Sequence, residues 1–289
     1  MFDSHVHYSF TRFDENFRYL TYTDGSYEIQ TGRRPDVLAC VRAGGVTGVV
    51  EPAIQFETNA RVLALARENP GFVYPAVGVH PLYCHEAPKE KCAELDLLAQ
   101  TPGVVAIGET GLDFHYPKER QHRPEQRFWF RYSLRLAHRM GLPLILHIRS
   151  AYPQAIRMLR RRPFLLKDGG VVHCFNESAA IAKRLLRMGF FFGIGGYLLK
   201  DDAESATLRN AVRVIPLDRI LLETDAPYVL PYLPDLISPN QSKKICNTST
   251  VIRAVAERIA LIQGIDVQTV LDRTEANARK LFRIPESET

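Results

Sequence analysis

The sequence predicts a single-domain TIM barrel, (β/α)₈, spanning residues 1–289. Three observations lead to this α/β class. Eight short apolar runs alternate with amphipathic stretches, the runs are continuous rather than alternating in polarity, and 289 residues suit one such barrel. Continuous apolar runs are typical of parallel strands buried on both faces. An open, doubly wound sheet is the alternative, but no glycine-rich phosphate-binding turn follows the first run.

Each apolar run is expected to be one barrel strand, and each amphipathic stretch one helix. The expected strands are 2–7, 46–52, 72–79, 104–109, 142–147, 170–174, 190–194 and 219–225. The expected helices are 35–43, 57–68, 89–100, 124–140, 152–161, 178–188, 203–214 and 248–263, followed by a short helical tail at 267–282. Repeated strand–helix units imply a parallel sheet with right-handed crossovers.

Two connections are expected to be long loops, 9–34 after the first strand and 226–247 after the eighth. In a barrel both follow strand carboxyl ends, where loops build active sites, and both flank the closing seam. Loop 9–34 mixes aromatic residues with arginines, a pattern that could stack bases and hold phosphates. Its acidic residues cancel its basic ones, which favours a lid that packs its aromatics on the barrel rim.

Composition excludes several other classes of protein. With 46% hydrophobic and 24% charged residues, the chain is typical of globular proteins rather than disordered ones. No apolar run approaches the ~18 residues of a membrane span, and the first ten residues lack the features of a secretory signal. The five cysteines form no C-x-x-C pair, which favours a reducing, cytoplasmic compartment. A net charge of +5 permits an anionic substrate without establishing one.

Metal-ligand residue types recur at the ends of the expected strands. His5 and His7 are two apart, so both imidazoles lie on one face of the first strand. Several other expected strands also end in a histidine or carboxylate, and such groups are buried only when paired or bound to metal. These strand-end residues are Glu109, His147, His173 and Asp225. Six ligands with one shared carboxylate are enough for two divalent ions, and a set without thiolate suits Mg, Mn or Zn.

The motifs around these residues resemble the TatD-type metal-dependent hydrolases, a barrel branch of the amidohydrolase superfamily that includes Mg- or Mn-dependent deoxyribonucleases. The resemblance covers nearly the whole chain. It rests on F-D-S-H-V-H near the start, G-E-T-G-L-D-F-H (108–115), L-H-I-R-S-A (146–151), V-H-C-F (172–175), L-L-E-T-D-A-P (221–227) and T-E-A-N-A-R-K-L-F (274–282).

The resemblance implies a pair of metal ions bridged by Glu109. One ion would be bound by His5, His7, Glu109 and Asp225, and the other by Glu109, His147 and His173. A water between the ions would be the nucleophile, and Asp225 could accept its proton as a base. The resemblance also places His80 near the substrate phosphate.

Substrate-facing positions depart from the family pattern, at Ser150, at Asn176-Glu177 and at 246–249. The resemblance therefore predicts the catalytic chemistry better than the substrate specificity. Arg149 could hold a phosphate, with a loop-end salt bridge as the alternative, and His115 could touch substrate or be an exposed loop residue.

Five further features have more ordinary interpretations. Asp3 could orient a histidine ring or make a strand-end hydrogen bond. Asp113 is expected to cap a turn or orient a ligand. Cys174 is expected to point away from His173 as a buried, inert thiol. The arginines at every fourth position of 123–139, and those at 160–162, are expected to lie on solvated outer faces.

The resulting prediction is a two-metal hydrolase of phosphodiesters, with DNA as the leading substrate and no membrane association. The same constellation could open a lactone or cleave an amide, and fold alone does not exclude either reaction. A metal-binding protein without turnover is the second alternative. The sequence makes no prediction of metal identity, of exonuclease or endonuclease action, or of oligomeric state.

Overall fold

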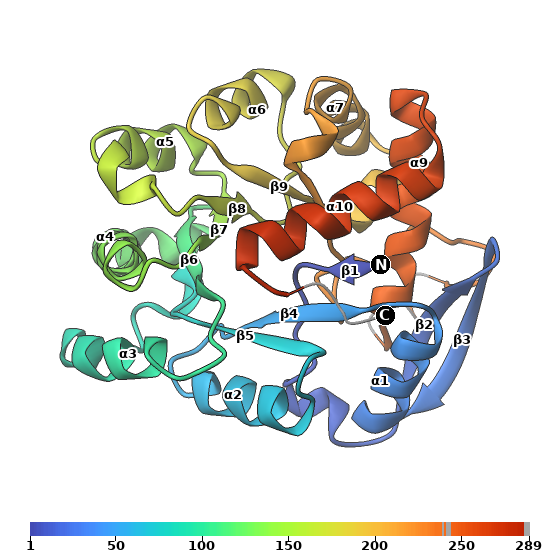
Figure 1. Cartoon of the computed structure of the whole chain (residues 1–289), viewed down its shortest axis with the longest axis horizontal. Helices are drawn as coiled ribbons and strands as arrows, with labels where there is room; N and C mark the ends of the chain where they lie inside the picture. The colour runs from blue at the N-terminus through green and yellow to red at the C-terminus, as the bar shows by residue number, and fades with distance from the viewer. Residues whose placement is uncertain (239, 241–243, 286–289) are drawn as a thin grey trace.

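The computed structural model describes residues 1–238, 240 and 244–285. Eight parallel strands pair in chain order in a barrel sheet (Figure 1). The strands are β1 (Phe2–Asp3), β4 (Gly48–Pro52), β5 (Val73–Val77), β6 (Ala106–Asp113), β7 (Leu144–Arg149), β8 (Gly170–Val172), β9 (Phe191–Ile194) and β10 (Ile220–Leu222). The predicted TIM barrel is therefore confirmed.

The barrel closes just beyond the ends of β1 and β10, through residues that no longer count as strand. The amide of Ser4 donates to the carbonyl of Leu222 over 2.9 Å, and Val6 forms a parallel bridge with Ala226. β1 and β10 are consequently shorter than the predicted strands 2–7 and 219–225. The backbone pairing nevertheless continues along most of both ranges.

Helices surround the barrel (Figure 1), and short 3-10 turns lie between the elements. The helices are α1 (Arg34–Ala43), α2 (Thr58–Glu68), α3 (Cys92–Ala99), α4 (Arg123–Met140), α5 (Tyr152–Arg160), α6 (Ala179–Leu186), α7 (Ala203–Val212), α9 (Ile252–Gln263) and α10 (Val267–Phe282). The 3-10 turns are Thr11–Phe13, Pro81–Tyr83, Lys89–Lys91, Pro117–His122, Pro163–Leu166, Gly196–Leu199, Leu217–Arg219 and Ser249–Val251. None of the described helices is long and apolar enough to cross a membrane.

The prediction of 9–34 as a loop is wrong, because most of it is a β-hairpin. β2 (Phe17–Thr23) and β3 (Ser26–Gly32) pair antiparallel, with Thr23 opposite Ser26. Asp24 and Gly25 form the turn with φ of 49° and 84°. A two-residue Asp-Gly turn of positive φ matches the twist of a hairpin, so this dipeptide was the signal that the sequence interpretation missed.

The hairpin joins the two long connections into one small sheet. β11 (Ile245–Cys246) pairs in parallel with β2, and Leu20 and Tyr22 pack against Ile237. Segment 9–34 and the described part of segment 226–247 therefore border the same side of the barrel, as expected for the segments that follow its first and last strands. Positions 239 and 241–243 of the second connection lie outside the described residues.

The final helix, predicted as a tail, covers the amino-terminal end of the barrel. α10 crosses in front of the strands in Figure 1. Its buried Ala278, Leu281 and Phe282 pack in one cluster with side chains from all eight barrel strands, among them Phe2 and Val50. This base layer closes the barrel opposite the loops that follow its strands.

Truncating Phe282 should therefore destabilise the whole fold. The ring is 2% exposed and packs under the barrel, so Phe282→Ala should lower the free energy of unfolding by about 3–5 kcal/mol. The exposed neighbour Lys280 provides the control, because Lys280→Ala should change it by less than about 0.5 kcal/mol. Urea denaturation followed by circular dichroism measures both. Similar values for the two variants would contradict a core role for α10.

Candidate metal centre

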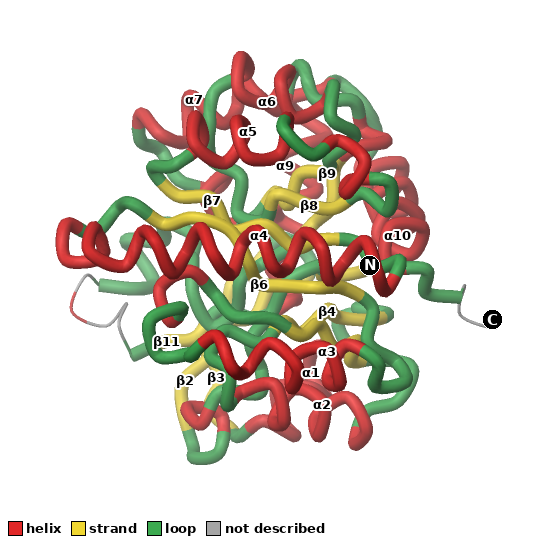
Figure 2. The backbone as a smooth tube through the Cα atoms, turned by 90° about the vertical axis from the view of Figure 1, so that its left-hand side faces the viewer, coloured by secondary structure: helices red, strands yellow, loops and turns green. Residues whose placement is uncertain are grey.

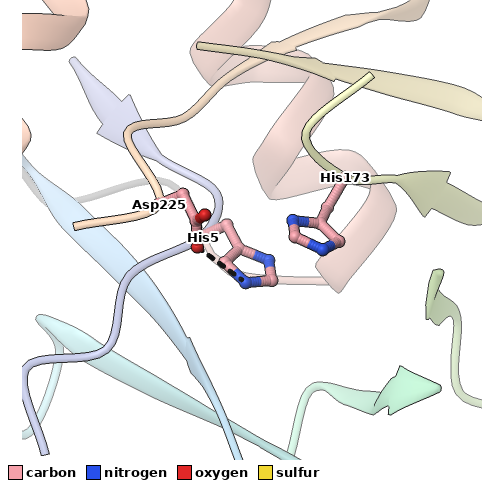
Figure 3. Close-up of side chains that lie close together, drawn as sticks. All are labelled: His5, His173 and Asp225. Atoms are coloured by element: carbon pink, nitrogen blue, oxygen red, sulfur yellow. Dashed lines mark ion pairs between the residues drawn. The ribbon is translucent and has the colours of Figure 1, made fainter. Parts of the chain in front are cut away.

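The six residues predicted as ligands lie together at the carboxyl end of the barrel. His5 and His7 follow β1, Glu109 and His147 lie in β6 and β7, His173 follows β8 and Asp225 follows β10. The six therefore come from five strands or from the turns directly beyond them, with His5 and His7 sharing the turn after β1. Figure 3 shows His5 and Asp225 meeting from the two sides of the seam, with the ring of His173 stacked on His5 at 3.9 Å between centroids.

Four atoms from His5, His7, Glu109 and Asp225 converge as one group. The Nε2 atoms of His5 and His7 are 3.2 Å apart, and each is 3.5 Å from Oε2 of Glu109. Oδ1 of Asp225 lies 3.8 Å and 3.3 Å from the same two nitrogens. Ligands about 2.0–2.1 Å from a tetrahedral ion stand about 3.3 Å from one another, so the four atoms fit a divalent ion.

A second group forms around the other oxygen of Glu109. Oε1 of Glu109 lies 2.7 Å from Nε2 of His173 and 3.5 Å from Nδ1 of His147, and those two nitrogens are 3.0 Å apart. Three ligands leave room for water or substrate, which is typical of catalytic rather than structural metal sites. Glu109 thus presents one oxygen to each group.

Electrostatics also favours cations between these side chains. The ion pairs that Glu109 and Asp225 make are with imidazoles. Burial by itself would lower the pKa of His7, but the carboxylates of Asp225 and Glu109 raise it to about 9. The pKa of neighbouring His5 is lowered to about 4 by burial and by His173. If the rings of His5 and His7 were both protonated, their N–H groups would point at each other. A divalent ion instead neutralises the carboxylates and accepts the lone pairs of both imidazoles.

Local backbone features aim Glu109 at the mouth. The β6–β7 register shifts between Ile107 and Thr110, and the amide of Glu109 donates to the carbonyl of Ala53 over 3.1 Å. Gly111 has φ 143°, and a Cβ there would clash with the carbonyl oxygen of His147. Glycine is therefore required where β6 runs this close to β7.

Asp113 combines the two roles expected for it, because one oxygen accepts from the amide of His115 over 2.9 Å in the turn after β6 and the other orients His147. Its Oδ2 lies 3.1 Å from Nε2 of His147, which leaves Nδ1 facing Glu109. Gln126 of α4 holds the backbone of Asp113 by two hydrogen bonds of 3.0 Å. A carboxylate on the far nitrogen determines the tautomer and raises the basicity of a ligating imidazole.

His80 lies beside this cluster as a hydrogen-bond donor. Its Nδ1 accepts from the amide of Leu82 over 3.1 Å, so a neutral ring carries its proton on Nε2. Burial and the nearby His147 lower the pKa of His80 to about 3, which keeps the ring neutral. Nε2 lies 3.8 Å from Oε1 of Glu109. An N–H group facing the cluster can bind an anionic substrate oxygen but offers no lone pair to a metal.

Asp3 makes the strand-end hydrogen bonds that were the alternative to orienting a ring. Its oxygens accept from the amides of His5 and Thr224 over 3.2 and 3.1 Å, and from the Thr224 hydroxyl over 2.6 Å. These bonds join the two sides of the seam. Burial raises the pKa of Asp3 to about 6, although these hydrogen bonds lower it.

The orientation predicted for Cys174 is wrong. Alternation along a strand would point it away from His173, but β8 ends at Val172 and Cys174 has φ 50°. Its half-buried thiol consequently approaches both His173 and Glu223, with one potential ligand atom of each residue within 4.8 Å of the others. Burial raises the pKa of the thiol well above its usual range, which is consistent with the inert character expected.

Two buried carboxylates at the mouth were missed by the sequence interpretation. Glu51 accepts from the amides of Tyr8 and Ser9 over 2.8 Å each, so it holds the turn that follows His7. Glu223 accepts from the amide of Cys174 and lies 4.0 Å from Nδ1 of His173. Both stand inside the apolar runs V-V-E-P and L-L-E-T-D, and a charge within such a run was the available signal.

A cavity of about 710 Å³ opens over the cluster. Its rim combines Phe10, Tyr116 and Tyr228 with the basic side chains of Arg149 and Lys200. Arg149 donates to the hydroxyl of Tyr116 over 3.3 Å, and its guanidinium lies over the same ring. His115, in contrast, is exposed and does not line this cavity, so substrate binding by His115 stays a prediction.

A parallel barrel with histidines and carboxylates at the carboxyl ends of its strands defines the class of barrel metal-dependent hydrolases. The sequence model described as TatD related DNase matches residues 2–283. The 3'-5' ssDNA/RNA exonuclease TatD of Erwinia tasmaniensis is 34% identical over 252 residues, 87% of this chain and 94% of that protein. The chain therefore belongs to the TatD-related DNase family.

Two further relatives agree with this assignment. The uncharacterized metal-dependent hydrolase YcfH of Escherichia coli K12 is 34% identical over 252 residues, which cover 87% of this chain and 89% of that protein. The crystal structure of YJJV, a TatD homologue from Escherichia coli K12, superimposes with a TM-score of 0.80 at 27% identity. That superposition covers 99% of this chain and 98% of the other.

Metal content should reveal whether Glu109 serves both groups. Glu109→Gln should reduce binding at two sites, because each group loses one carboxylate oxygen, whereas His147→Ala should weaken mainly the second group. Elemental analysis after dialysis against Mn²⁺ or Zn²⁺ measures ions per chain, with Lys280→Ala as an exposed control. Loss of a single ion in both variants would remove the bridging role.

Proposed function

We propose that this protein hydrolyses phosphodiester bonds of single-stranded nucleic acid, DNA in particular, with two divalent ions. The single observation that carries the proposal is Glu109, whose two oxygens face two separate ligand groups on the floor of one cavity. His5, His7 and Asp225 would complete the first site. His147 and His173 would complete the second.

The ions would supply Lewis-acid activation of the phosphoryl oxygen and a hydroxide nucleophile at neutral pH. Asp225 is the proton acceptor that we assign to the attacking water. His7, at 3.3 Å from Oδ1, and the other nearby imidazoles lower the pKa of Asp225, although burial opposes them, so the carboxylate is ionised at neutral pH. His80 donates its Nε2–H to a phosphate oxygen and stabilises the charge that develops there.

The rim supports a single-stranded polynucleotide as the substrate class. Phe10 stacks on the ring of His7 with centroids 4.9 Å apart, and Tyr228 packs against Phe10 at 6.0 Å while 51% exposed. On the same rim Arg149 lies over the ring of Tyr116 and Lys200 over that of Tyr197. The rim therefore offers both base stacking and phosphate contacts, which is the usual combination for single strands. The exonuclease activity in the name of the Erwinia relative agrees with this choice.

The cellular setting that we propose is the cytoplasm. The five cysteines, Cys40, Cys84, Cys92, Cys174 and Cys246, are all free thiols in the structure, which supports a reducing compartment.

The direct test is hydrolysis of 5'-labelled single-stranded DNA and RNA by the whole chain in Mg²⁺, Mn²⁺ or Zn²⁺. We expect stepwise shortening from the 3' end, in the direction that the relatives' names state, and complete loss of activity in EDTA. Lactones and amides run in parallel as alternative substrates. Turnover of either with no cleavage of nucleic acid would replace the proposal by a small-molecule hydrolase, and no turnover at all would favour a metal-binding protein.

Removing the His80 donor should slow catalysis without emptying the metal sites. Loss of one preorganised hydrogen bond to a transition-state oxygen lowers kcat by about 10²-fold, which is the effect expected for His80→Ala. His80→Gln, which restores an N–H group, should recover part of the loss. Metal content per chain should stay unchanged in both variants. A drop in metal content would make His80 a ligand instead.

A further inference from the structure

The charges of this chain are strongly segregated. Residues 123–187 contain 14 of the 37 basic residues but only 3 of the 32 acidic ones, which leaves 23 basic against 29 acidic residues in the rest of the chain. The segment builds α4, α5 and α6; in Figure 2, α4 crosses the middle of the view and α5 and α6 lie above it, so the three helices cover neighbouring parts of the helical ring. The modest net charge of +5 therefore combines one strongly basic side with an otherwise acidic molecule.

The basic side contains a hollow between α5 and α6, away from the metal centre. We call it the α5–α6 hollow, and its volume is about 460 Å³. Pro153 and Ile156 contribute its apolar part. Its charged part consists of four exposed arginines, Arg157, Arg160, Arg161 and Arg184.

Among the described residues, these four arginines have no protein partner for their charge. Within the part of the chain that the structure describes, none of their guanidinium groups donates a hydrogen bond or lies in an ion pair. Two arginines of the neighbouring α4 are engaged instead: Arg139 makes two hydrogen bonds to Asp96, and Arg123 lies over the ring of Phe114. Like charges around one hollow repel each other, so an anion that bridges them would bind favourably.

The chemistry of the α5–α6 hollow fits a phosphate backbone. Guanidinium groups bind phosphates through paired hydrogen bonds, and the basic residues here are arginines rather than lysines. Phe164, 65% exposed, lies in the 3-10 turn Pro163–Leu166 that follows α5. A membrane presents a flat array of headgroups, which suits a convex basic patch better than a hollow.

We infer that the α5–α6 hollow is an accessory binding site for the backbone of single-stranded nucleic acid, separate from the catalytic cavity. Each barrel helix starts near the mouth and runs toward the opposite end, so α5 and α6 form a path from the mouth along the outer wall. A long strand would contact both places, whereas a short one would reach only the cavity. The choice of nucleic acid as ligand rests on the proposed function.

The test compares two quadruple variants of the whole chain that lower the net charge equally. The first replaces Arg157, Arg160, Arg161 and Arg184 by Gln. The control replaces four basic residues elsewhere by Gln as well. They are Arg67 on α2, Arg258 on α9, and Arg273 and Lys280 on α10. Fluorescence anisotropy measures binding of a single-stranded oligonucleotide of about 40 nucleotides, long enough to leave the cavity. EDTA prevents turnover, and thermal melting verifies that both variants are folded.

The first variant should raise the Kd at least about tenfold and lower the slope of log affinity against log salt by about 3, since each lost single-strand phosphate contact contributes about 0.7. The control should change the Kd by less than about twofold. Cleavage of a small phosphodiester such as bis(p-nitrophenyl) phosphate should be unaffected in both. Equal losses in the two variants, or a preference for phosphatidylserine vesicles over the oligonucleotide, would overturn the inference.

These outcomes are independent of the catalytic proposal. Oligonucleotide binding that depends on the α5–α6 hollow, in a protein that cleaves no nucleic acid, would leave this inference standing and remove the proposed function. If the protein cleaves oligonucleotides and the first variant binds them as tightly as the unchanged chain, the proposed function stands and this inference is wrong.

Discussion

The structure depends most on the need to compensate one buried negative charge. Glu109 is 2% exposed, and a carboxylate out of water must be paired or bound to metal. His5, His80, His147 and His173 all lie within 3.8 Å of one of its oxygens. Each imidazole belongs to a barrel strand or to the turn that follows one. The fold of the barrel therefore also determines which imidazoles surround Glu109.

The closing seam is where that constraint is most demanding. His5 and Asp225 belong to opposite sides of it, and the carbonyl of His5 accepts from the amide of Asp225 over 2.9 Å. Asp3 adds hydrogen bonds to both sides within two residues of His5. Asp225 itself has φ 56°, a conformation that Asp tolerates better than most residues. Closing the barrel and assembling the first ligand group are therefore one event, and α10 supports it from the opposite end.

Binding surfaces are arranged around this rigid centre on less constrained elements. Phe10, Tyr228 and Ile245 of β11 line the cavity, and β2 and β3 extend the small sheet from β11. The arginines of α5 and α6 lie on the outer wall. The six candidate ligands stand in the motifs that resemble the family, whereas Ser150 and Asn176, the predicted departures from its pattern, follow β7 and β8. Such a division lets substrate preference vary while the chemistry is retained.

The sequence by itself determined the barrel and the six residues at its mouth. Buried parallel strands are continuous apolar runs, and a polar residue that interrupts such a run toward its carboxyl end is expected at the mouth, as with Glu109 and His147. The direction in which Glu109 points depends in addition on the shift in the β6–β7 register. Local chemistry also contained the hairpin, since Asp24-Gly25 specifies its turn. Only the tertiary structure decided which side chains meet across the fold. Asp3 contacts Thr224, 221 positions away, and Glu51 holds the turn after His7. No periodicity encodes these pairs, because their distances depend on how the closed barrel brings separate strand ends together.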